Sequence, residues 1–199
     1  MITAKLLNFK ARREGFVLIP YRDGTGYSIG CGHFLGPKHP GPRTLTIQES
    51  IKLLNADVAE RMPRIEAAIK VPLADNKMHA LLDLYYQGGN DGLDAVAAII
   101  NKRDPDDKKS CLTSDREAAR EFLEWDTSAD GTHMEGLLKR RGLNVAMYTA
   151  DEYGSDLDKI PWWDRVDEET GKARMKDVKW YVVQPGDFTP TPQLQKRKR

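Results

Sequence analysis

The spacing of apolar residues predicts a short helix at the amino end of the chain, followed by a small sheet. Apolar and basic residues recur at helical spacing over residues 3–13, and Gly15 is placed to end that helix. In residues 17–34, aromatic and β-branched residues are interspersed with Gly and Asp, which predicts a twisted hairpin or a three-stranded sheet. The Pro- and Gly-rich residues 36–44 then predict a loop.

A mainly helical region is predicted to follow. Thr46 and Glu49 form a capping box, so a helix should begin near residue 47, and Pro63 should kink or restart it. The most apolar helix should begin at Asp75 and stop at the Gly88-Gly89 pair. Further helices are predicted at about Leu93–Lys102, from a capping box at Ser114 with Glu117 to Trp125, and at Met134–Tyr148.

After Gly154 the helical pattern weakens. Residues 155–188 are predicted to form an appendage, and residues 189–199, which end in KRKR, a basic disordered tail. The appendage is expected to pack through three aromatic residues, Trp162, Trp163 and Trp180.

Charge and composition exclude several classes of protein. The chain has 31 basic and 30 acidic residues, so no large field favours nucleic acid or a membrane surface as partner. We expect no signal peptide, no transmembrane segment and no stable membrane insertion, because no apolar run is long enough. Two cysteines, Cys31 and Cys111, make no disulfide framework and are expected to be reduced.

Two carboxylates near the amino end suggest a chemistry. Glu14 lies at the predicted helix end, and Asp23 follows nine positions later in a Gly-rich turn. Glycosidic bond cleavage needs one protonated carboxyl as general acid and one ionised carboxylate, and two different environments can set these opposite states. Alone, Glu14 would be read as a solvated helix-end residue and Asp23 as a turn residue.

No metal site or cofactor is predicted. No clustered spacing of His, Cys and Asp around His33 supports a metal site, so a structural salt bridge or hydrogen bond from the hairpin to a neighbouring helix is favoured for it. The glycines of the hairpin lack a P-loop or dinucleotide fingerprint and are interpreted as turn and packing residues.

Three separated segments resemble one family. These are Glu14 and Asp23 followed by the IGCGH block, the segment VPLADNKMHALLDLYYQGG at 71–89, and FLEWDTSADGTHMEGLLKRR at 122–141. In order and approximate spacing they are similar to the phage-type lysozymes, the T4 and lambdoid endolysins.

The resemblance implies an α+β, lysozyme-like fold of two lobes, with the glycan in a cleft between them, plus a C-terminal extension. The catalytic domain would span residues 1–154, with a hairpin lobe at about 15–45 and a helical lobe at about 64–154. The implied activity is that of a muramidase, which hydrolyses the β-1,4 bond between N-acetylmuramic acid and N-acetylglucosamine in peptidoglycan.

One catalytic position departs from the family pattern. The family has Thr six residues after the Asp and directly before IGxGH, whereas this chain has Ser28 there, five residues after Asp23. Ser28 can orient a water as Thr does, but without a methyl group its χ1 is less fixed. Thr25 is the alternative source of that hydroxyl.

The resemblance also implies roles outside the carboxylates. Arg140 or Arg141 is expected to pair with Glu14, and Tyr21 and Gln87 to bind the substrate. An endolysin of this kind would be a monomer in the host cytoplasm until a holin released it to the cell wall.

Two alternatives stay open at this point. The chain could be a peptidoglycan-binding protein without activity, or a lytic transglycosylase, which leaves anhydro-muramic ends. Stereochemistry is open as well, since inversion or retention depends on how far apart the two carboxylates lie.

Overall fold

The computed structural model describes residues 1–128, 131–154, 158–167 and 170–190. It divides into two compact units. The sheet unit comprises Ile2–Glu60 and the chain from Ser155 onward, and the helical unit comprises Met1 and Arg61–Gly154. The boundary falls inside helix α2, which runs unbroken from Ile47 to Ala68 and therefore passes Pro63 without a restart.

Helix α1, Ala4–Glu14, opens the sheet unit. The Thr3 side chain caps it by accepting a hydrogen bond from the Leu6 amide at 3.2 Å, and Gly15 follows its last residue. Its inner face buries apolar side chains completely, namely those of Leu6, Leu7, Phe9 and Ala11. This face forms the core of the unit with Phe16, Ile29 and Ile160.

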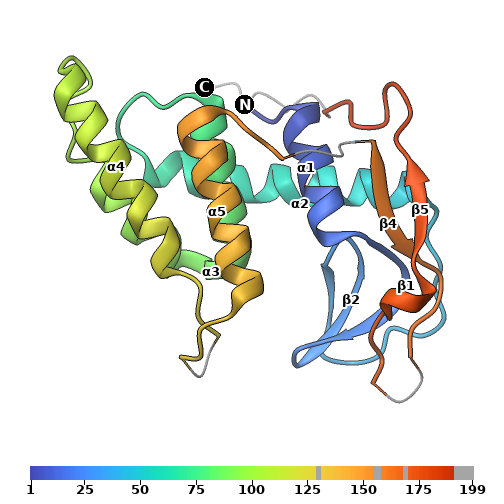
Figure 1. Cartoon of the computed structure of the whole chain (residues 1–199). Coiled ribbons are helices and arrows are strands. Elements are labelled where there is room, and N and C mark those ends of the chain that lie inside the picture. Colours follow the sequence, from blue (N-terminus) through green and yellow to red (C-terminus); the bar gives the residue numbers. More distant parts are fainter. Residues whose placement is uncertain (129–130, 155–157, 168–169, 191–199) are drawn as a thin grey trace, which may run out of the picture. The chain divides into compact units, whose positions relative to one another are not determined.

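Five strands form one mixed sheet in the order β3-β2-β1-β4-β5. The strands are β1 Phe16–Asp23, β2 Gly26–Gly30, β3 His33–Gly36, β4 Lys159–Trp163 and β5 Lys179–Val182. β1, β2 and β3 are antiparallel neighbours, whereas β4 pairs with β1 in parallel through Phe16 with Trp162 and Val17 with Trp163. Figure 1 shows the orange-red C-terminal strands beside the blue N-terminal ones.

The expected appendage is therefore part of the sheet. Trp163 is buried and donates its indole N–H to the Arg174 carbonyl at 2.9 Å. Trp180 is 57% exposed, so the prediction that it packs is wrong: on β5 its ring projects into solvent. Between β4 and β5 lies a single 3-10 turn, η1, Met175–Asp177. Residues 191–199, most of the predicted tail, lie outside the described residues.

The helical unit contains α3 Asp75–Ile100, α4 Lys108–Glu124 and α5 Glu135–Ala150. α3 bends at Gly89, whose φ of 60° and ψ of −153° are not helical, which accounts for the two helices that the sequence predicts there. Its buried residues include Leu81, Leu84, Leu93 and Val96. Helix α3 packs against both α4 and α5, whose buried rings Phe122 and Tyr148 lie 5.5 Å apart between centroids.

Helix α4 begins earlier than its sequence pattern predicts. Asp107 caps it by accepting from the Lys109 amide at 2.9 Å, so the helix starts at Lys108. Ser114, predicted to be the cap, is buried inside the helix and donates to the Ile99 carbonyl at 3.4 Å. The capping box at Ser114 was a wrong prediction, because that serine ties α4 to α3.

Candidate active site

Glu14 is the last residue of α1, at the point where the chain turns into β1. Its side chain is 25% exposed and accepts a hydrogen bond from the Lys10 ammonium at 3.0 Å, one helical turn earlier. The Lys10 side chain is fully buried. A buried cation this close restrains the Glu14 carboxyl in one orientation.

Asp23 ends β1, and the two-residue turn Gly24-Thr25 leads into β2. Gly24 has a φ of 55°, which suits the first central position of a tight hairpin turn. Ser28 is fully buried on β2 and donates its hydroxyl to Asp23 Oδ2 at 2.8 Å. Thr25 is exposed at the turn. Of the two candidate hydroxyls, that of Ser28 is therefore the one bonded to Asp23.

Strand alternation places Tyr21 on the same hairpin face as Asp23 and Ser28. Tyr21 lies directly opposite Ser28 in the ladder, and Asp23 is two residues further along β1. Burial raises the pKa of the Tyr21 hydroxyl, and the negative charges of Asp23, Cys31 and Glu14 raise it further. Both candidate carboxylates thus contribute to the electrostatic environment of the Tyr21 hydroxyl.

His33 connects the hairpin to a helix. Its Nδ1 lies 2.8 Å from Oδ1 of Asp57 on α2, and the Asp57 side chain is only 6% exposed. The contact fixes the end of β3, which leaves His33 in a structural position.

The two arginines of α5 have different surroundings within the helical unit. Arg140 forms a bidentate pair with Asp83, at 3.0 Å from Nε and 2.8 Å from Nη2. Arg141 donates to the Trp125 carbonyl at 2.8 Å and to Gln87 Oε1 at 3.1 Å. Burial lowers the pKa of Arg141. Pairing of either arginine with Glu14 stays a prediction.

Two charged residues were missed by sequence reasoning. Asp83 is completely buried in α3, where it also accepts from Asn144 at 2.9 Å. A lone acid within an apolar helix is a signal that it has a buried partner. Lys10 stands four residues before Glu14, a spacing that brings two side chains of a helix together.

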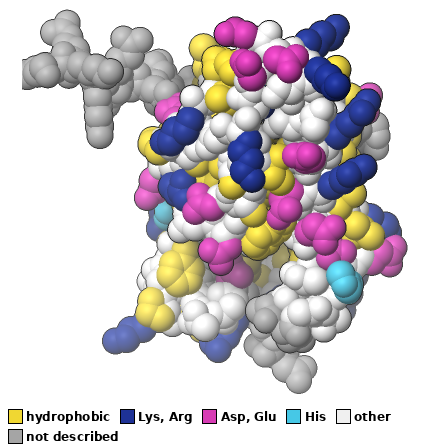
Figure 2. Space-filling view, turned by 90° about the vertical axis from the view of Figure 1, so that its left-hand side faces the viewer, with side chains coloured by type: hydrophobic (Ala, Val, Ile, Leu, Met, Phe, Trp, Pro, Cys, Tyr) yellow, Lys and Arg dark blue, Asp and Glu magenta, His cyan; other side chains and the backbone are white. Residues whose placement is uncertain are grey.

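In the described parts of the chain, no group of three His, Cys, Asp or Glu side chains could hold a metal ion. Cys31 and Cys111 are both free thiols. Among the described helices, none is long and apolar enough to cross a membrane. Figure 2 shows basic and acidic side chains intermixed on one face of the molecule, without a patch of a single sign.

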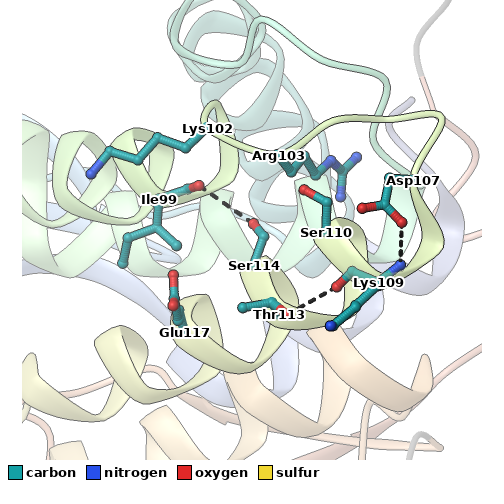
Figure 3. A pocket seen from close by; sticks show the side chains of 9 residues that line it. All are labelled: Ile99, Lys102, Arg103, Asp107, Lys109, Ser110, Thr113, Ser114 and Glu117. Carbon is teal, nitrogen blue, oxygen red and sulfur yellow. Dashed lines mark hydrogen bonds between the residues drawn. The ribbon is translucent and has the colours of Figure 1, made fainter.

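A cavity of about 330 Å³ lies between the end of α3 and the start of α4, lined in part by Lys102, Arg103 and Lys109. Figure 3 shows how its hydroxyl groups are used: Ser114 donates to the Ile99 carbonyl and Thr113 to the Lys109 carbonyl. The Ser114 bond joins α4 to α3 and the Thr113 bond lies within α4, so both hydroxyls have structural partners and we assign the cavity no role in catalysis.

A family model described as phage lysozyme matches residues 11–143. An endolysin of Bacillus phage B103 is 27% identical over 161 residues, which make up 81% of this chain and 54% of that protein. The chain thus spans about half the length of that relative. A SAR-endolysin of Enterobacteria phage P21 is 30% identical over 128 residues, 64% of this chain and 72% of that protein.

A solved structure supports the fold. A mutant of P22 lysozyme superimposes with a TM-score of 0.59 at 26% identity, over 75% of this chain and 99% of that one. This match confirms the predicted α+β class. The family match ends before β4, so the two C-terminal strands lie outside it.

Proposed function

The chain belongs to the phage lysozyme family, and from this premise we propose that it is a muramidase. It would hydrolyse the β-1,4 bond between N-acetylmuramic acid and N-acetylglucosamine in bacterial peptidoglycan. The observation that carries the proposal is the pair of acids at the two ends of the α1–hairpin segment: Glu14 is the last residue of α1, and Asp23 ends β1 with the buried Ser28 hydroxyl bonded to it.

In the proposed mechanism Glu14 is the general acid. It protonates the glycosidic oxygen as the bond to the anomeric carbon breaks, which avoids expulsion of an alkoxide. Lys10 orients the carboxyl through its 3.0 Å contact and keeps that end of α1 rigid. Tyr21, on the hairpin face that carries Asp23 and Ser28, is the first proposed substrate contact, and Gln87 is the second.

Asp23 and Ser28 act on the water that attacks the anomeric carbon. Ser28 donates to Oδ2 of Asp23, so the remaining lone pairs of the carboxylate and of the Ser28 oxygen are available to hold a water. A water held there would attack the anomeric carbon opposite the leaving group, which gives inversion. Direct attack by Asp23 with retention is the alternative, and the configuration of the first-formed product distinguishes the two.

We propose a biological setting for the chain from what its relatives are. Both curated relatives are endolysins of phages, so we propose that this chain lyses a bacterial host at the end of a phage cycle. It would act as a monomer, remain in the host cytoplasm before lysis and reach the wall through a holin pore.

The test compares wild type with Glu14→Gln and Asp23→Asn on purified peptidoglycan, measuring loss of turbidity. Both variants should slow clearing by about 100-fold or more, because each removes one half of the acid–base pair. Arg165→Gln, at an exposed surface residue of the sheet unit, is the control and should clear the wall at the wild-type rate. Clearing at the wild-type rate by Glu14→Gln would eliminate Glu14 as the acid.

A further inference from the structure

A pocket of about 570 Å³ lies within the sheet unit. Its lining includes Arg22, Tyr27 and His39 from the hairpin and the following loop, and Asp167, Thr170 and Gly171 from the segment after β4. Arg22 and Tyr27 are opposite each other in the ladder and alternate with Asp23 and Ser28. Arg22 and Tyr27 therefore project from the hairpin face opposite the proposed catalytic groups. Tyr21, whose side chain belongs to the catalytic face, also contributes to the lining.

The C-terminal segment forms one wall of this pocket. The Arg22 amide donates to the Gly171 carbonyl at 2.9 Å, which fixes the segment against β1. Gly171 approaches so closely that an added Cβ would lie 2.9 Å from the Cβ of Arg22. This wall lies after residue 143 and is therefore outside the family match.

The pocket presents hydrogen-bond donors and aromatic surface. The Arg22 guanidinium lies 5.9 Å from the Tyr27 ring centroid, and the structure pairs it with no carboxylate among the residues it describes. His39 packs edge-on against Tyr27 at 4.8 Å. Its Nδ1 accepts from the Gly41 amide at 3.0 Å, so the neutral ring carries its hydrogen on Nε2, as a donor.

The one described carboxylate in the lining is already satisfied. Asp167 accepts from the Thr170 amide at 2.7 Å and from its hydroxyl at 2.9 Å. It also pairs with Arg174 at 2.8 Å. A ligand in the pocket therefore meets hydrogen-bond donors on Arg22, His39 and Tyr27, next to the aromatic rings of the lining.

We propose that this pocket binds a carboxylate of the peptide stems of peptidoglycan. A guanidinium matches a carboxylate in shape and charge, and the rings can cover the aliphatic part of a short peptide. Naming peptidoglycan as the source of the carboxylate rests on the proposed function. The pocket would hold the protein on the wall and raise the local concentration of glycan at the catalytic face.

The proposal is tested by titrating the full chain with a soluble stem tetrapeptide, followed by NMR chemical-shift changes and calorimetry. A second titration uses the same peptide with its carboxylates converted to amides. We expect the free acid to bind at least about tenfold more tightly than the amide, since the charge-assisted bonds to Arg22 are lost. Equal affinities would overturn the proposal.

Two matched pairs of variants locate the binding. Arg22→Gln should weaken binding of the acid about tenfold, whereas Lys38→Gln removes the same charge from the exposed residue before His39 and should not. Gly171→Ala should also weaken binding, because its Cβ meets Arg22. Gly186→Ala is its control, with a similar positive φ of 91° but no atom within 4 Å of the added Cβ.

The outcome is independent of the hydrolase proposal, because the peptide contains no glycosidic bond. Binding of the acid that Arg22→Gln and Gly171→Ala leave unchanged would place the peptide elsewhere and reject this pocket. Failure of the peptide to bind, with an Arg22-dependent affinity for peptide-free glycan instead, would also reject it. Loss of activity in Glu14→Gln alone bears only on the catalytic proposal.

Discussion

The buried hydroxyl of Ser28 determines how Asp23 is oriented. A serine lacks the methyl group that restricts χ1 in threonine, so its hydroxyl needs another restraint. The 2.8 Å bond to Asp23 and complete burial provide one. The hairpin can therefore carry a serine at this position and still present a fixed hydroxyl beside the carboxylate.

Ser28→Ala should lower kcat on peptidoglycan by about tenfold or more, because the attacking water loses one of its two proposed hydrogen-bond partners, Asp23 and Ser28. KM should change little. Thr25→Ala serves as the comparison, since that hydroxyl is exposed at the turn, and it should stay within about twofold of wild type. Steady-state rates of soluble fragment release measure both. A larger effect from Thr25→Ala would move the role to that residue.

A functional residue can be predicted from the sequence when the pattern that identifies it lies within one short stretch of the chain. Glu14, Asp23 and Ser28 lie within a single stretch of the chain, so a short motif suggests all three. The partners Asp83 and Arg140 are 57 residues apart, and nothing in the sequence of either helix indicates that they meet. Lys10 could have been suggested from its i,i+4 spacing to Glu14, but its complete burial depends on the packing of α1.

At the scale of elements, the C-terminal strands show what local patterns do not determine. The WYVV segment indicates a strand, but its neighbours in a sheet cannot be derived from alternation alone. β4 pairs in parallel with β1, the strand that leads to Asp23. The extension therefore supports the strand that positions a proposed catalytic residue.

Trp163→Ala should destabilise the sheet unit by about 3–5 kcal/mol, the usual cost of removing a large buried aromatic residue. Its ring packs on Gly15, where an added Cβ would lie only 2.6 Å away, and its indole N–H bonds to the Arg174 carbonyl. Trp180→Ala removes an exposed ring and should change stability by less than about 0.5 kcal/mol. Urea unfolding followed by circular dichroism compares the two. Similar losses for both would contradict the assigned packing.

Helix boundaries show the same dependence on context. The Thr46 and Glu49 capping box does begin α2, with the Glu49 amide donating to the Thr46 hydroxyl at 3.1 Å. The Glu49 carboxylate in turn accepts from the Thr46 amide at 2.7 Å and from its hydroxyl at 2.9 Å, and these two bonds lower the pKa of Glu49. The equivalent pattern at Ser114 lies inside α4, because Asp107 offers an earlier cap and the Ser114 hydroxyl binds α3. Two caps of similar local quality are distinguished only by tertiary contacts.

At the scale of the molecule, one buried histidine makes the helical unit sensitive to acid. His79 donates from Nε2 to the Met1 carbonyl at 2.7 Å, while its Nδ1 accepts from the Tyr153 hydroxyl at 2.5 Å. The bond from Tyr153 requires an unprotonated Nδ1, and therefore the neutral ring. Burial lowers the pKa of His79 below its usual value of 6.5.

The sign of the pH effect follows from linkage. The unfolded chain takes up a proton at His79 near pH 6.5, whereas the folded chain resists it. The contribution of neutral His79 to the free energy of unfolding is therefore complete above about pH 6.5 and decreases as the pH falls below that value. Melting temperatures measured between pH 7.5 and 5 should fall less steeply for His79→Leu than for wild type. His39→Gln, at an exposed ring, should keep the wild-type slope, and an unchanged slope for His79→Leu would exclude this residue as the source.

Hydrolysis of the glycosidic bond has a direct chemical signature. Purified peptidoglycan digested by the full chain in oxygen-18 water should release fragments that end in a reducing N-acetylmuramic acid with one labelled oxygen at the anomeric carbon, as read by mass spectrometry of quickly quenched samples. Glu14→Gln should release almost none. Unlabelled 1,6-anhydro-muramic ends as the main product of the wild-type chain would contradict the muramidase mechanism and identify a lytic transglycosylase.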